Sequence, residues 1–213
     1  MNGWIAELDN THFSHCFGGH DWIVCDPEAM AGGPTLLLCL DLDDPRLDFL
    51  AIEGLKSLPI CSYINCDLWI EPQHYEIKPD SKQLVLLERS NTYTTILDAT
   101  LSYPNPLPRK SISLREMNDV ESGQAQEDYW KACDTFLGTS SFIRILGKPL
   151  WLQRANIPHC GCGIEQTYIC SIGYDYPELS GLIEKRSFFI GEAALYFFLC
   201  KSCKILTVIS QPT

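Results

Sequence analysis

Hydrophobic and polar positions divide the chain into short apolar runs that end at turn residues. The clearest run covers residues 34–42 and is closed by residues 43–45, which are Asp-Asp-Pro. A short apolar run closed in this way is typical of a buried strand followed by a turn. Residues 84–87 predict a second strand, and residues 93–97 predict a third.

The C-terminal part of the chain has similar runs that are richer in aromatic and β-branched residues, which favour strands. Strands are predicted over residues 142–146, 166–172, 194–199 and 204–209. Residues 127–137 instead place apolar side chains at helical spacing, so a short amphipathic helix is expected to end at Gly138. Residues 102–126 begin with three closely spaced prolines and continue with polar residues. We expect them to form a linker or an exposed connection.

The two halves of the chain resemble each other, which indicates a degenerate internal duplication. The matched pairs are residues 17–22 with 146–151, residues 36–44 with 167–176, Cys39 with Cys170, and Cys66 with Cys200. Chance matching among common turn residues is the alternative. The expected fold is mostly β (α+β), with two similar β-rich halves at residues 1–101 and 127–213 and a few short helices.

Composition and charge narrow the class of protein. A chain of 213 residues with 46% hydrophobic and 20% charged residues has enough apolar material for a globular core. A net charge of −11 argues against binding a phosphate backbone, and it favours solubility or a basic protein partner. The first ten residues lack the features of a signal peptide, and the apolar runs are too short to span a membrane. We therefore expect a cytoplasmic protein whose cysteines are mostly reduced.

Two cysteine pairs predict a structural metal site. Cys160 and Cys162 belong to a glycine-bearing turn, and Cys200 and Cys203 form a Cys-x-x-Cys pair after a predicted strand. Four thiolates satisfy the tetrahedral preference of zinc and leave no position for a substrate. Because a single residue separates the first pair, His159 could replace one cysteine. The alternatives are inert thiols in the core and a redox pair.

The other cysteines lack a regular ligand spacing and are expected in the core. They are Cys16, Cys25, Cys39, Cys61, Cys66, Cys133 and Cys170.

Catalytic motifs are absent or incomplete. Residues 36–44 match the Asp-x-Asp strand of haloacid-dehalogenase-type phosphatases, but the other residues of that chemistry cannot be placed. His20 and Asp21 similarly lack the further ligands of a metal-dependent phosphohydrolase. The chain has neither a Gly-x-Ser-x-Gly elbow nor a glycine-rich phosphate loop. We expect no catalytic residues.

Three segments carry a resemblance to known families. They are residues 146–153 (Leu-Gly-Lys-Pro-Leu-Trp-Leu-Gln), residues 158–162 with the first cysteine pair, and residues 196–203 with the second. The chain is similar in these segments to the YwqG-like family of bacterial proteins and to the C-terminal part of the eukaryotic programmed cell death protein 2 family. The match is clearest over residues 142–211 and fainter over residues 17–90.

The resemblance implies a mostly β architecture of two similar halves and no established catalytic residues. It also implies two alternative functions. The eukaryotic relatives are implicated in chaperoning a ribosomal protein, and some bacterial relatives are encoded among toxin-immunity genes, which points to an immunity protein. Lys148 stands where the family often has a second glycine, and the Cys160-Gly161-Cys162 spacing is tighter than the family pattern.

The leading functional hypothesis is therefore a non-enzymatic bacterial immunity protein that binds and neutralises a basic toxin, such as a nuclease. The alternatives are a chaperone or assembly factor for a basic ribosomal protein, and a metal-dependent or thiol-dependent enzyme without a recognisable motif. Acidic residues expected on the partner surface are Asp43, Asp44, Glu53 and Glu121.

Overall fold

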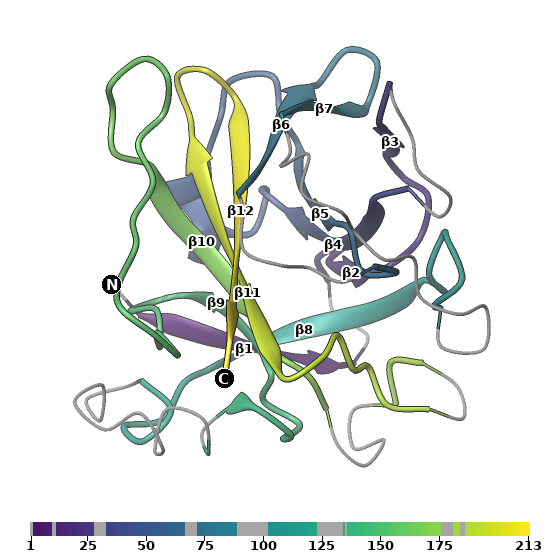
Figure 1. The fold of residues 1–213 in the computed structure, drawn as a ribbon, viewed down its shortest axis with the longest axis vertical. Helices are drawn as coiled ribbons and strands as arrows, with labels where there is room; N and C mark the ends of the chain where they lie inside the picture. The colour runs from purple at the N-terminus through teal and green to yellow at the C-terminus, as the bar shows by residue number, and fades with distance from the viewer. Residues whose placement is uncertain are drawn as a thin grey trace.

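The computed structural model describes most of the chain and shows a mostly β protein, which confirms the expected class (Figure 1). The described residues are 2–9, 12–27, 33–66, 72–88, 102–122, 134, 136–175, 181–183 and 186–213. Within them, the one helix with defined bounds is a 3-10 helix, η1 (Pro45–Leu50), where a few short helices were expected.

In the described part of the chain, twelve strands are joined by hydrogen bonds into one sheet. They are β1 (Gly3–Leu8), β2 (Cys16–Phe17), β3 (Ile23–Cys25), β4 (Thr35–Asp41), β5 (Ser57–Ser62), β6 (Gln73–Lys78), β7 (Gln83–Glu88), β8 (Lys110–Glu116), β9 (Ile143–Leu146), β10 (Thr167–Ile172), β11 (Ala193–Cys200) and β12 (Ile205–Pro212). The order is β3-β7-β6-β12-β11-β10-β9-β1-β8-β2-β4-β5. The two expected halves therefore share one sheet, because β12 pairs with β6 and β9 pairs with β1.

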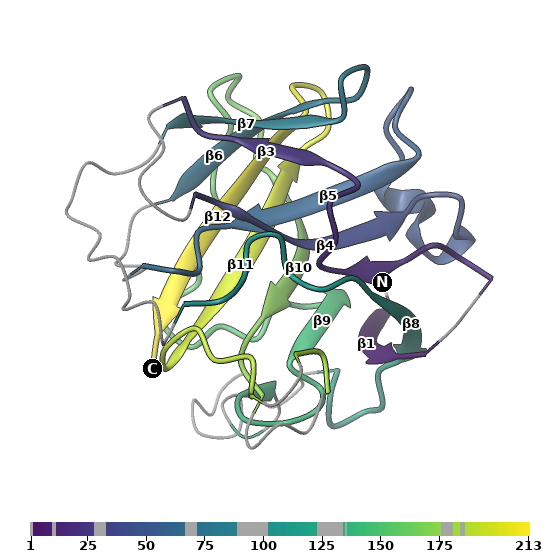
Figure 2. The same cartoon turned by 90° about the vertical axis from the view of Figure 1, so that its right-hand side faces the viewer.

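The sheet curls until its two ends approach each other. Trp22, just before β3, donates from Nε1 to Ser57 Oγ of β5 over 3.1 Å. The Tyr63 N–H, just after β5, donates to Gln73 Oε1 of β6 over 3.1 Å. Figure 1 shows β10, β11 and β12 crossing β1 and β8 at a steep angle, and Figure 2 shows β3, β7 and β6 together above β5 and β4. The result is a nearly closed sheet around one main core.

Alternating burial explains why these segments form strands. In β6, Tyr75 and Ile77 are buried, whereas His74 and Glu76 between them are half-buried on the other face. Strand β11 is buried at every position because both of its faces are covered. On its outer face the Trp151 ring stacks on Tyr196, with 4.8 Å between ring centroids. A second, smaller core thus lies outside the sheet, under residues 150–152.

The strand order is the same on both sides of the central β1–β8 pair. Strands β9, β10 and β11 follow β1, and strands β2, β4 and β5 follow β8 in the same sequence. The β4–β5 and β10–β11 pairs both contain a register shift. A duplicated unit would give this arrangement if its two copies exchanged their first strands, so that β1 pairs with β9 and β8 pairs with β2. The internal duplication itself stays a prediction.

Of the two cysteine matches between the halves, one joins corresponding strands and the other does not. Cys39 pairs with Cys16 of β2, and Cys170 pairs with Ile145 of β9, so the first match joins corresponding strands. Cys66 lies beyond the end of β5, whereas Cys200 is the last residue of β11. The second match therefore joins positions that are not equivalent.

One sequence expectation about the connections is wrong, and two lie outside the described residues. Residues 110–116, expected within an exposed connection, form β8, which pairs with β1 and β2 near the centre of the sheet. Its alternating Ile112 and Leu114 are buried, so burial determines this strand despite the preceding prolines. The strand predicted at 93–97 and most of the helix predicted at 127–137 are outside the described residues. The other predicted strands are confirmed.

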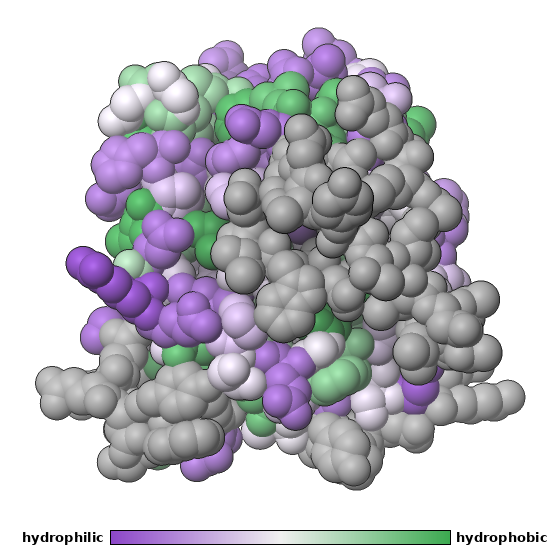
Figure 3. All heavy atoms as spheres, viewed as in Figure 1, coloured by the Kyte–Doolittle hydropathy of each residue, from purple (hydrophilic) through white to green (hydrophobic). Residues whose placement is uncertain are grey.

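The described surface mixes residue types. On the face drawn in Figure 3, polar and apolar described residues are interspersed. No helix in the described part of the chain has the length and apolar character needed to cross a membrane.

Candidate metal centre

The first cysteine pair lies on a tight hairpin turn between residues 158 and 166. The Cys160 N–H donates to the Ile164 carbonyl over 2.8 Å, and the Gly163 N–H donates to the Cys160 carbonyl over 2.8 Å. Gly163 has a φ of 85°, a conformation that favours glycine. This local folding holds Cys160 and Cys162 next to each other.

The second pair lies where β11 turns into β12. Cys200 pairs with Ile205 at the last position of the β11–β12 register, and Cys203 belongs to the turn between them. The Lys204 carbonyl accepts a hydrogen bond of 2.9 Å from the Ile77 N–H at the neighbouring β6. The turn that carries Cys203 is therefore held by three strands, β11, β12 and β6.

The two turns bring the four predicted sulfur ligands together, as the sequence spacing indicated. The Sγ atoms of Cys160, Cys162, Cys200 and Cys203 all lie within 4.8 Å of one another, and those of Cys162 and Cys200 are 3.7 Å apart. A tetrahedral zinc site with Zn–S bonds of about 2.3 Å separates its sulfur atoms by about 3.8 Å. The residues present thus fit a closed four-thiolate site.

Burial and hydrogen bonding make the four thiols different. Cys160 and Cys200 are buried, whereas Cys162 and Cys203 are exposed. The Ile164 N–H and the Cys203 thiol lower the pKa of Cys162 to about 7, whereas burial raises the pKa of Cys200. Hydrogen bonds with the other cysteines raise the pKa of Cys203 to about 12. Cys162 therefore ionises more readily than Cys200 and Cys203.

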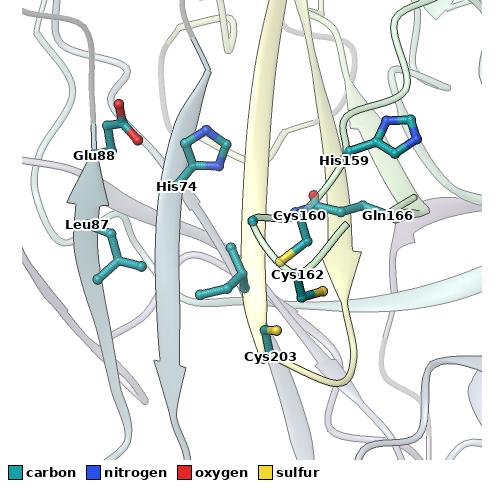
Figure 4. A pocket seen from close by; sticks show the side chains of 10 residues that line it. His74, Leu87, Glu88, His159, Cys160, Cys162, Gln166 and Cys203 are labelled. Carbon is teal, nitrogen blue, oxygen red and sulfur yellow. The ribbon is translucent and has the colours of Figure 1, made fainter. Parts of the chain in front are cut away.

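His159, considered as an alternative ligand, is not part of the donor set. It is exposed, and no His159 nitrogen is among the donor atoms that cluster with the sulfurs. Figure 4 shows its imidazole turned away from the cysteine side chains. The candidate donor set at these two turns is therefore the four cysteines without His159.

A second cluster joins Cys16, Asp21 and Cys39, whose ligand atoms also lie within 4.8 Å of one another. Cys16 and Cys39 face each other across the β2–β4 pair, a neighbourhood that their sequence spacing could not indicate. A hydrogen bond with Cys39 lowers the pKa of the Cys16 thiol. Arg109 donates to Asp21 over 3.2 Å, and its positive charge opposes a cation at this place.

The remaining cysteines mostly follow the sequence expectation. Cys61, Cys66 and Cys170 are buried, as are Cys16 and Cys39, and Cys25 is half-buried. Burial raises the pKa of Cys61 and of Cys170, so both are neutral thiols in the core. Cys133 lies outside the described residues.

The prediction that Asp44 lies on an acidic partner surface is wrong, because Asp44 is fully buried. Its carboxylate accepts hydrogen bonds from His15 and from Arg46, and these hold it inside the fold. Glu121 is engaged within the chain by two hydrogen bonds from Arg115, of 2.9 and 2.8 Å. Asp43 and Glu53 are exposed.

The phosphatase-like strand also has a structural explanation. Asp41, at the end of β4, accepts the Ser14 N–H over 2.8 Å and the Asp43 N–H over 3.1 Å. Asp44 caps η1 by accepting the Arg46 N–H. These carboxylates organise the acidic, proline-closed turn that the sequence indicated.

Comparisons with known proteins add nothing to the class of protein that the fold and the cysteine cluster define. No protein-family model, curated protein or solved structure matches the chain. The resemblance to the YwqG-like family stays a prediction. The class is therefore a mostly β protein with a four-cysteine cluster that could hold a metal ion.

Proposed function

We propose that Cys160, Cys162, Cys200 and Cys203 hold a structural zinc ion. The observation that carries the proposal is the meeting of two cysteine pairs from separate hairpin turns within 4.8 Å. Thiolates are the preferred ligands of zinc in structural sites, and four of them close its coordination sphere. The ion would fix the turn at 158–166 to the β11–β12 turn and so stabilise the fold.

We further propose that the protein is a non-enzymatic binding protein, most concretely a bacterial immunity protein that neutralises a basic toxin. The net charge of −11 suits electrostatic steering toward a basic partner. Exposed apolar side chains near the cysteine cluster offer contact area. Ile164 is 51% exposed on the first cysteine turn, Leu87 is 55% exposed, and Phe49 is 46% exposed beside Lys201.

The test is co-expression of the chain with the product of the adjacent gene. We expect the two to copurify and the chain to protect cells from that product. Other basic proteins that copurify with the chain provide the comparison. Capture of ribosomal proteins instead of the gene product would support the chaperone hypothesis. Failure to copurify, together with the absence of protection, would refute the immunity hypothesis.

X-ray absorption spectroscopy of the purified zinc protein separates a binding protein with a structural metal from a metal-dependent enzyme. We expect four sulfur ligands and no oxygen ligand. A water-derived oxygen in the first coordination sphere would indicate an open metal position and would favour an enzyme.

A further inference from the structure

A pocket of about 510 Å³ lies beside the proposed metal centre. Its lining includes His74 of β6, Leu87 and Glu88 of β7, Ile205 of β12 and Gln166 at the end of the first cysteine turn. Figure 4 shows His74, Leu87 and Glu88 on one side of the pocket, and Gln166 with the cysteines on the other. Its volume is in the range of pockets that hold small ligands.

Gln166 is the first indication of what this pocket binds. Gln166 is 3% exposed, and neither its Oε1 nor its Nε2 has a hydrogen-bond partner among the described residues. Leaving a buried polar group unpaired costs free energy, so such groups are rare unless water or a ligand satisfies them. The free Oε1 offers an acceptor to a donor that enters the pocket.

The charge of the lining is the second indication. Among the described residues of the lining, Glu88 contributes a carboxylate and His74 and His159 contribute imidazoles, whereas none is a lysine or an arginine. His74 lies with Nδ1 at 2.9 Å from Thr207 Oγ1, and burial lowers the pKa of its imidazole, which favours the neutral ring. Four thiolates around a divalent ion would leave the adjacent metal centre net negative. The pocket therefore attracts a cation.

We infer that this pocket binds the side chain of an arginine residue presented by the basic protein partner. The Glu88 carboxylate accepts from one edge of the guanidinium and Gln166 Oε1 from another, while Leu87 and Ile205 pack against the methylene groups. Acceptors on opposite sides suit the planar guanidinium, whose five donors point in several directions, better than the compact ammonium of lysine. The protein source of the arginine rests on the proposed immunity function, and part of the negative charge rests on the proposed zinc site, whereas the Glu88 and Gln166 acceptors rest on neither.

The test uses N-acetyl-arginine amide as the probe in an NMR titration of the zinc-loaded protein. We expect saturable shifts of the Gln166 side-chain amide. N-acetyl-citrulline amide has the same shape without the charge and should bind at least about tenfold more weakly. N-acetyl-lysine amide should also bind more weakly. Free arginine should bind no tighter than the blocked amide, because tighter binding would indicate a small-molecule site instead.

Two substitutions complete the experiment. Glu88→Gln should weaken arginine-amide binding about tenfold, because it removes the carboxylate from the pocket. Glu76→Gln is the matched control, since Glu76 lies on β6 but pairs with Lys78 over 3.3 Å and does not line the pocket. Zinc content and melting temperature confirm that both variants are folded.

Equal binding of arginine and citrulline amides, or unchanged binding by Glu88→Gln, would overturn the inference. These outcomes are distinct from failure of the proposed function. If arginine amide binds as expected but no protein copurifies, the pocket stands and the immunity hypothesis fails. If a partner copurifies but neither its affinity nor arginine binding depends on Glu88, the pocket assignment fails alone.

Discussion

At the scale of single residues, His15 shows how burial selects one protonation state. The Asp41 N–H donates to His15 Nδ1 over 3.0 Å, so Nε2 carries the proton and donates to Asp44 Oδ2 over 2.8 Å. Burial lowers the pKa of His15, although its hydrogen bond with Asp44 acts in the opposite direction. Burial also opposes the charge of Asp44, but hydrogen bonds from Arg46 and His15 outweigh it and lower that pKa.

The pKa of His15 predicts a loss of stability in mild acid. Because the folded-state pKa lies below the unfolded value of 6.5, the unfolded chain binds the proton more readily. The free energy of unfolding should therefore fall as the pH drops through and below about 6.5. His15→Gln keeps a neutral donor but cannot titrate, so its stability should fall less between pH 7 and pH 5. Identical pH dependence in urea unfolding of the two proteins would contradict this explanation.

Glu121 predicts a contribution of the same pH sense at lower pH. Hydrogen bonds from Arg115 are the main reason that its pKa is lowered to about 2 from an unfolded value of 4.5. This stabilisation is present above about 4.5 and is lost as the pH falls toward about 2. Since Arg115 is 37% exposed, Glu121→Gln should cost only about 1 kcal/mol at pH 7.

Denaturant unfolding measures this effect, with Glu53→Gln as the control, because Glu53 is exposed. The control should keep wild-type stability. A Glu121→Gln variant that is as stable as the control at pH 7 would show that the Arg115 pair contributes nothing.

At the scale of secondary-structure elements, the sequence predicted strands best where one short apolar run is buried. β4 and β11 are such runs, and each was predicted within a few residues. β8 was missed because the preceding prolines resemble a linker, although Ile112 and Leu114 alternate with polar residues as in a half-buried strand. Short strands such as β2 contain too few residues to show any period, so only their pairing reveals them.

Close packing between β1 and the end of β9 gives a prediction at this scale. Gly147 has a φ of 73°, and a Cβ there would lie 2.9 Å from the Gly3 Cα. Gly54 also has a positive φ, 78°, but a Cβ there would meet nothing within 4 Å. Gly54→Ala should therefore cost only the backbone strain, about 1–2 kcal/mol.

Gly147→Ala should cost at least about 2 kcal/mol more, because backbone atoms of β1 must move. Thermal and urea unfolding of both variants measure the difference. Equal losses of stability would mean that the contact between Gly3 and Gly147 is not tight.

At the scale of the whole molecule, the sequence identified the four-cysteine set but not its surroundings. Two pairs with short internal spacing are visible in the printed chain, because each pair lies on one turn. The pocket beside them combines β6, β7 and β12 with the first cysteine turn, and the Cys16–Cys39 pair depends on the β2–β4 register. Neither could be predicted, because both arise from strands that become neighbours only in the folded sheet.

The central claim is that the four cysteines form a structural metal site that stabilises the whole fold. The most direct measurement is the zinc content of the purified protein together with its free energy of unfolding, for the wild type, Cys200→Ser and Cys203→Ser. Cys25→Ser is the matched control, because Cys25 is half-buried and outside the cluster.

We expect about one zinc ion per chain in the wild type and the control. Cys200→Ser and Cys203→Ser should lose the ion and at least about 3 kcal/mol of stability. A Cys200→Ser protein that is metal-free and as stable as the wild type would contradict the structural metal site, as would a wild-type protein that folds fully without any metal.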